Sequence, residues 1–109
     1  MANTFKLKTK ANVGVTTVGI YTAPAATTTV VIGITMANTY GSGVNVGVGI
    51  TRAGTTEDVK LLKNAPIPQG SSLEFMAGNK VVLEATDTVT VDSDTNNSVD
   101  AALTIMEIT

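Results

Sequence analysis

Apolar residues recur at every second position along much of this chain, and this period constrains the fold more than any other feature. In the segment VNVGVGIT, apolar residues alternate with polar residues or glycine (Val44, Val46, Val48 and Ile50). A period of two is typical of a β-strand with one buried face. Thr and Val are abundant and favour strands, because branched side chains fit a pleated surface. The pattern therefore predicts β-strands.

Turn-forming segments separate these stretches, among them YTAPAAT, NTYGSG, NAPIPQG and SDTNNS. Short strands with turns about every ten residues are typical of an antiparallel sandwich or jelly roll. We therefore predict an all-β protein, an antiparallel β-sandwich of jelly-roll type with about eight strands. Residues 1–16 are predicted to be an N-terminal arm or a first strand, and residues 17–109 the β-sandwich domain.

Three segments carry finer predictions. TTVVIGITMAN is expected to be a strand with Val30, Ile32, Ile34 and Met36 on one face, and EDVKLLK is also interpreted as a strand. In NAPIPQG the two prolines cannot donate backbone hydrogen bonds, which indicates a corner between strands. Ile67, between these prolines, is expected to be an apolar peg on an exposed strand edge.

Two side chains that many enzymes and transition-metal sites use are missing. The chain has no cysteine and no histidine, so it lacks thiols, the commonest general base and the commonest transition-metal ligand. A net charge of −2 and only 4% aromatic residues argue against a nucleic-acid partner. We expect no enzymatic activity, no cofactor and no bound metal.

Two further features concern membranes and export. The apolar runs are too short to span a membrane, and no membrane partner is expected. The N-terminal segment MANTFKLKTK lacks the apolar stretch of a signal peptide, which predicts synthesis in a cytoplasm without a cleaved leader.

Two motifs suggest ligand sites and fail as such. Asp92, Asp94 and Asn96 have the spacing that begins a calcium loop, but Asn97 replaces the required glycine and Leu103 the required glutamate, so a polar turn is the better interpretation. The glycines of VGVGI resemble part of a nucleotide-binding motif, but no helix pattern follows. Gly47 and Gly49 indicate either a bulge or the close approach of another backbone or subunit.

Contacts with a partner are expected at both ends of the chain and at these glycines. Near the N-terminus Phe5 is accompanied by three alternating lysines, which either dock on an acidic surface or protect a sheet edge from aggregation (Lys6, Lys8 and Lys10). At the C-terminus Met106 and Ile108 lie on the face opposite Leu103 and Ile105. This predicts contact with another subunit, or an edge covered by the N-terminal arm.

The segments VGIYTAPAATTTVVIGITMANTYGSGVNVGVGIT and LLKNAPIPQGSSLEFMAGNKVVLEATDTVTVDSDTNNSVDAALTIMEIT also carry a family likeness. Over residues 18–109 the chain resembles small β-sandwich virion proteins of tailed bacteriophages of the marine and cyanobacterial type. NAPIPQGSSLE and GNKVVLEATDTV are the more specific blocks.

This resemblance implies a structural virion protein, assembled in the host cytoplasm and present as a homo-oligomer, a trimer being expected. The expected function is that of a capsid decoration or cement protein that binds the major capsid protein and stabilises the shell. A tail, neck, baseplate or fibre accessory protein is the first alternative. A carbohydrate-binding module is a more distant one, suggested only by analogy with other jelly rolls.

Overall fold

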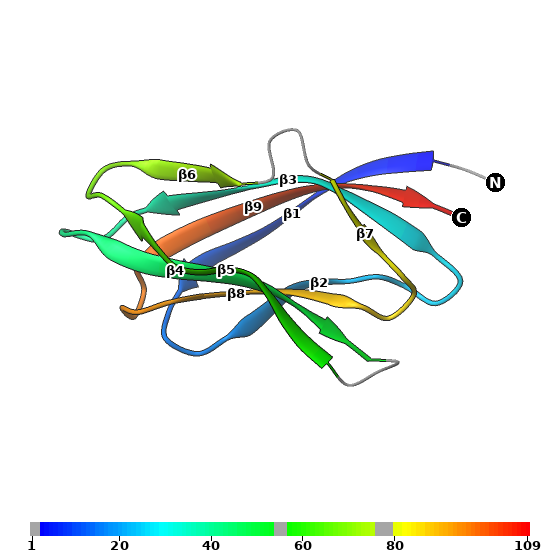
Figure 1. Ribbon diagram of the computed structural model, residues 1–109. Coiled ribbons are helices and arrows are strands. Elements are labelled where there is room, and N and C mark those ends of the chain that lie inside the picture. The colour runs from blue at the N-terminus through cyan, green and yellow to red at the C-terminus, as the bar shows by residue number, and fades with distance from the viewer. Residues whose placement is uncertain (1–2, 54–56, 76–79) are drawn as a thin grey trace.

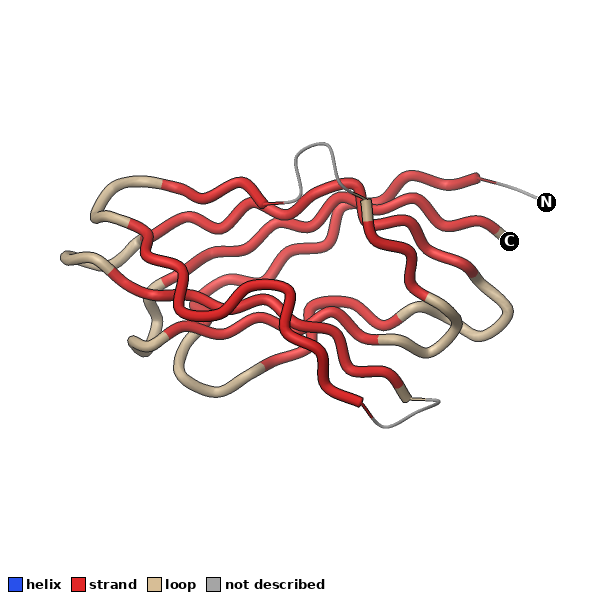
Figure 2. The backbone as a smooth tube through the Cα atoms, in the orientation of Figure 1, coloured by secondary structure: helices blue, strands red, loops and turns tan. Residues whose placement is uncertain are grey.

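A computed structural model of the chain describes residues 3–53, 57–75 and 80–109. These residues form nine β-strands and no helix (Figures 1 and 2). The strands are β1 (Asn3–Val13), β2 (Val18–Thr22), β3 (Thr28–Asn38), β4 (Val44–Arg52), β5 (Glu57–Ile67), β6 (Ser72–Phe75), β7 (Val81–Leu83), β8 (Thr88–Ser93) and β9 (Val99–Ile108). Among the described residues no helix could cross a membrane.

The strands form two antiparallel sheets that pack face to face (Figure 1). Sheet A has the order β1-β9-β3-β6, with β7 also paired to β3, and sheet B has the order β2-β8-β4-β5. The pairs β4–β5, β3–β6/β7, β2–β8 and β1–β9 are nested in the sequence, each enclosing the previous one. This is the arrangement of a jelly roll, and the predicted fold class is confirmed.

The core lies between the sheets and consists mainly of aliphatic side chains. In β4 the four alternating apolar residues are all buried, and β9 contributes Leu103 and Ile105, both fully buried. Residues 1–16 are predicted to be an arm or a first strand; within them, Asn3–Val13 form strand β1, which pairs with β9 at the edge of sheet A. The two termini therefore lie side by side at one end of the molecule (Figure 1).

The side chains of β3 that point into the core differ from those predicted, because the strand contains a bulge. Ile34 and Met36 are buried as expected, but Val30 and Ile32 are only half-buried, and Val31 between them is buried instead. The pairing register of β3 with β9 shifts between Val31 and Gly33. An extra residue in a strand reverses which side chains face the core, so Val30 points outward.

Only the second half of NAPIPQG is a corner. Residues 64–67 are the end of strand β5, where Pro66 pairs with Asn45, and the turn follows at residues 68–70. Ile67 is not an exposed peg. Its side chain is 1% exposed and belongs to the core. The Asn38 side-chain amide holds this corner, because Nδ2 donates to the Ile67 carbonyl at 3.0 Å and to the Ser42 carbonyl at 2.9 Å. Buried polar groups need such partners, and the corner is therefore fixed from inside the sandwich.

Candidate subunit interface

Four apolar side chains lie in one row across the outer face of sheet A, the face turned away from sheet B. The pairing registers place Phe5 opposite Met106, Met106 opposite Val30, and Val30 opposite Val82. Residues directly opposite each other in an antiparallel sheet point to the same side. We call Phe5, Met106, Val30 and Val82 the apolar row; it runs from edge strand β1 through β9 and β3 to β7.

The apolar row is open to solvent at both of its ends. Phe5 is 70% exposed and Val82 is 59% exposed, whereas Met106 and Val30 are half-buried between them. Leu7, 64% exposed, and the half-buried Ile108 flank the row on the same face. The solvated face of an antiparallel sheet is normally polar, and a contiguous exposed apolar patch marks an interaction surface.

The three lysines of β1 point to the other side of sheet A. Lys6, Lys8 and Lys10 lie opposite Ile105, Leu103 and Ala101 of β9, which are buried inner-face residues. Lys6 uses its position to form an ion pair, because its Nζ lies 2.9 Å from Glu107 Oε1. The β1 edge is thus apolar on one face and basic on the other.

Glu107 is the centre of a buried polar cluster that joins the two sheets. The Tyr21 hydroxyl of sheet B donates to Glu107 Oε2 at 2.6 Å and lies 2.8 Å from Thr29 Oγ1. Hydrogen bonds from Lys6 and Tyr21 hold the pKa of Glu107 below its usual value. Burial, reinforced by the Glu107 carboxylate, raises the pKa of Tyr21 to about 12. The Glu107 carboxylate therefore stays ionised, and both of its oxygens are bonded to neighbouring side chains. This arrangement stabilises the fold.

The two glycines expected to contact a partner lie in β4 of sheet B and are themselves buried. A Cβ at Gly49 would stand 2.9 Å from the Val59 carbonyl oxygen, and one at Gly47 would stand 2.5 Å from Asp92 Oδ1. The register of β4 with β5 shifts twice in this stretch. Of the two interpretations, the structure provides the bulge and the close approach of the chain's own backbone.

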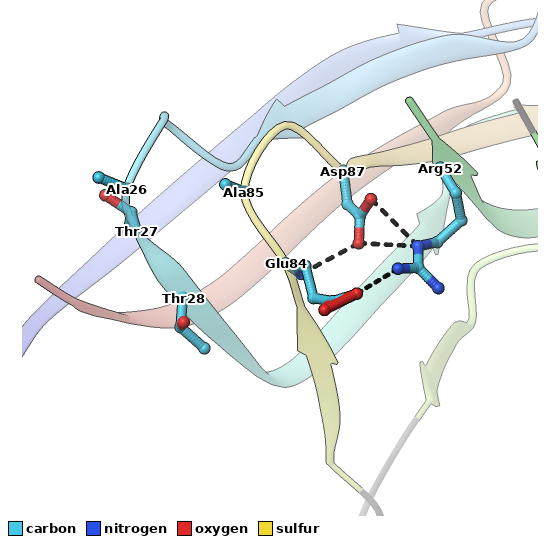
Figure 3. A pocket seen from close by; sticks show the side chains of 7 residues that line it. All are labelled: Ala26, Thr27, Thr28, Arg52, Glu84, Ala85 and Asp87. Atoms are coloured by element: carbon cyan, nitrogen blue, oxygen red, sulfur yellow. Dashed lines mark hydrogen bonds and ion pairs between the residues drawn. The ribbon is translucent and has the colours of Figure 1, made fainter. Parts of the chain in front are cut away.

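A charged cluster lies between β4 and the β7–β8 turn (Figure 3). Arg52 Nε is 3.1 Å from Asp87, and the Arg52 guanidinium also pairs with Glu84. Asp87 Oδ2 in turn accepts from the Glu84 backbone N–H at 3.0 Å. Asp87 raises the pKa of Arg52. The cluster borders an open pocket of about 420 Å³, and its three charged groups are occupied with one another.

The acidic segment that resembled the start of a calcium loop contains the turn between β8 and β9. Asp94 Oδ1 accepts the Asn45 backbone N–H at 3.1 Å. Within the described part of the chain, no group of three or more potential ligand side chains is placed to hold a metal ion.

The structure brings some of the expected contact residues together and separates others. Phe5 and Met106 are neighbours in the apolar row, with Ile108 beside them, whereas the lysines face the opposite side and the glycines belong to the other sheet. Sequence reasoning missed Val30 and Val82. The bulge in β3 conceals the outward position of Val30, and Val82 belongs to a three-residue strand that is too short to show alternation.

Comparison with known proteins gives a fold and no family. No family model matches the chain, and no curated protein matches it. Among solved structures the chain is similar to a protein described under "Bacillus endospore appendages form a novel family of disulfide-linked pili". The TM-score is 0.57 at 16% sequence identity, and the match covers 99% of this chain and 87% of that chain.

This finding contradicts the function expected from the sequence. The similar structure is a bacterial pilus protein and not a phage virion protein. The expectation of a capsid decoration protein, with its tail and carbohydrate-binding alternatives, is therefore wrong. A resemblance carried by turn and strand blocks such as NAPIPQGSSLE bears on the fold more than on the function, because one fold serves many functions.

Proposed function

We propose that this chain is a structural subunit that associates with copies of itself into a pilus-like filament. The observation that carries the proposal is the apolar row, with Phe5 and Val82 largely exposed at its two ends. The similarity to a pilus protein supports the same class of function. The absence of the usual catalytic side chains, histidine and cysteine, agrees with a structural role.

Assembly of this chain has to rest on non-covalent contacts. The similar pili are described as disulfide-linked, but this sequence contains no cysteine. The hydrophobic effect is the available driving force, and full burial of a Phe or Leu side chain contributes about 1.5–3 kcal/mol. Repetition of one modest contact along a filament gives a stable assembly through avidity.

The proposal is tested by replacing the two most exposed apolar residues of the face together, Phe5→Ser and Leu7→Ser. Both side chains are mostly in water in the single subunit, so the variant should fold normally. Loss of about 3 kcal/mol of interface burial raises the dissociation constant about 100-fold. Sedimentation velocity across a concentration series and negative-stain electron microscopy measure the effect.

Val15→Ser is the matched control, because Val15 is 56% exposed but lies in the loop between β1 and β2, outside the apolar row. It should assemble as the unaltered chain does. A chain that stays monomeric up to millimolar concentration, or a double variant that assembles normally, would overturn the proposal. Far-UV circular dichroism confirms that all three proteins are equally folded.

A further inference from the structure

A second apolar surface lies beside β7, at the opposite edge of sheet A from Phe5. It is an open pocket of about 430 Å³ with aliphatic walls and a charged rim. We call it the valine pocket; its walls are Ile50, Val59, Val81 and Val82, and its rim is Arg52, Glu84 and Asp87. Val59 is 42% exposed and Val82 is 59% exposed, so apolar surface is open here in the single subunit.

We propose that the valine pocket receives the Phe5 side chain of a second copy of this chain. The inference rests on the proposed function and deepens it, because it names the surface on which the exposed end of the apolar row docks. The occupant is the N-terminal half of β1, with Phe5 as the anchor.

The dimensions and chemistry of the two surfaces match. An enclosed apolar cavity of about 150 Å³ is enough to hold a benzene ring, and the valine pocket is larger than this and open on one side. Phe5 is 70% exposed and is the type of residue that anchors interfaces by filling a pocket. Aliphatic walls give the ring dispersion contacts that water does not provide.

The charges around the two surfaces are also complementary. Arg52 at the pocket rim faces two carboxylates, Glu84 and Asp87, so the rim carries net negative charge. β1, the strand that bears Phe5, carries three lysines and no carboxylate. The lysines lie on the face opposite Phe5, and Lys6 is paired with Glu107 of β9, so they give this edge of the subunit net positive charge without touching the anchor. Opposite potentials steer encounter and fix the register of two surfaces.

The positions of the two surfaces make this contact head-to-tail. Phe5 is on β1 and the valine pocket adjoins β7, and β9 and β3 separate these strands in sheet A. Three strand spacings amount to about 14 Å. A subunit therefore presents the anchor at one edge and the pocket at the other, and a repeated heterologous contact produces a ring or an open filament. Val82 ends the row and also lines the pocket, so the two apolar surfaces adjoin at this edge of the subunit.

The test uses two single variants that damage opposite halves of the contact. Phe5→Ser removes the anchor and keeps the pocket, and Val59→Asp places a charge in the pocket and keeps the anchor. Val59 lies outside the apolar row, so its replacement leaves the row intact. We expect each variant alone to have a dissociation constant raised at least tenfold and to stay monomeric where the unaltered chain assembles. Val15→Asp is the matched control and should assemble normally.

An equimolar mixture of the two variants then tests whether Phe5 of one copy docks in the valine pocket of another. Each pair of molecules retains one good anchor and one good pocket, so the mixture should form a complex of twice the 11.2 kDa chain mass and nothing larger. Failure of the mixture to associate overturns the inference, as does normal assembly of Val59→Asp. If Val59→Asp assembles while Phe5→Ser/Leu7→Ser does not, the proposed function stands and the pocket is not the docking surface. If the unaltered chain never assembles, both the proposed function and the docking of Phe5 in the valine pocket are wrong.

Discussion

At the scale of single residues, Glu107 has the most consequential environment in the molecule. Its carboxylate is buried, yet it accepts from Lys6 at 2.9 Å on its own sheet and from Tyr21 at 2.6 Å on the other sheet. A buried charge is tolerated only when its partners compensate the loss of water. One side chain thus fastens edge strand β1 to β9 and sheet A to sheet B.

This arrangement predicts a pH-dependent stability. The folded-state pKa of Glu107 is lowered, so its contribution is present above its unfolded-state pKa of about 4.5 and is lost as pH falls through the lowered value. Glu107→Gln should reduce the free energy of unfolding by about 1–3 kcal/mol at pH 7, and the difference from the unaltered chain should narrow at pH 3. Urea unfolding followed by circular dichroism measures both.

Glu74→Gln is the control for this experiment, because Glu74 is an exposed carboxylate on β6. It should change stability little at either pH. If the loss in unfolding free energy of Glu107→Gln stays constant from pH 7 to pH 3, the ionised Glu107 carboxylate is not the source of the stability.

Tyr21 gives the opposite dependence at alkaline pH, because its pKa is raised in the folded state to about 12. The stability contributed by the neutral Tyr21 hydroxyl is complete below its unfolded-state pKa of about 10 and is lost as pH rises toward about 12.

At the scale of elements, strand β4 shows how glycine permits two strands to pack. β4 lies between β8 and β5, and its register with β5 shifts twice. Gly49 faces a fixed backbone atom, the Val59 carbonyl, whereas Gly47 faces the movable end of the Asp92 side chain. A side chain at Gly49 would clash with the Val59 carbonyl, and this clash can be relieved only if the backbone of β5 moves.

Substitution of these glycines should therefore have graded effects. Gly49→Ala should lower the free energy of unfolding by about 1–3 kcal/mol, because the new methyl group overpacks against backbone. Gly47→Ala should cost less, since Asp92 can turn away. Gly41→Ala should be within about 0.5 kcal/mol of the unaltered chain, because nothing lies within 4 Å of the added Cβ. Urea titration ranks the three, and equal effects at Gly41 and Gly49 would contradict the explanation.

Elements also show what a sequence pattern can and cannot predict. The alternation in β4 correctly identified its buried side, because a strand covered on one face has a period of two. In β3 the same pattern placed Val30 inward, because a bulge depends on the register with β9 and leaves no periodic signal. The apolar row was therefore only half visible in the sequence, through Phe5 and Met106, and its other half required the sheet.

At the scale of the whole molecule, the topology is a long hairpin folded over twice. The innermost pair, β4–β5, joins strands that almost follow each other, whereas the outermost pair, β1–β9, joins the two ends of the chain. Turn spacing predicted the two-sheet class, but not which strand ends up beside which, because pairing between distant segments has no local signature. The proximity of Phe5 to Met106 is a consequence of that pairing.

The nested topology predicts an order of folding. Closing the chain for β1–β9 costs about 2–3 kcal/mol more loop entropy than closing it for β4–β5, so the inner hairpin should form early and the outer pair late. Val48 of β4 and Val99 of β9 are matched probes, 1% and 0% exposed. In the Phe5→Ser/Leu7→Ser background, which keeps the subunit monomeric, Val48→Ala should chiefly slow folding and Val99→Ala should chiefly speed unfolding. Stopped-flow circular dichroism in urea measures both rates. The reverse assignment would show instead that contact between the two ends of the chain nucleates the sandwich, and that the strand presenting Phe5 is in place before the inner hairpin.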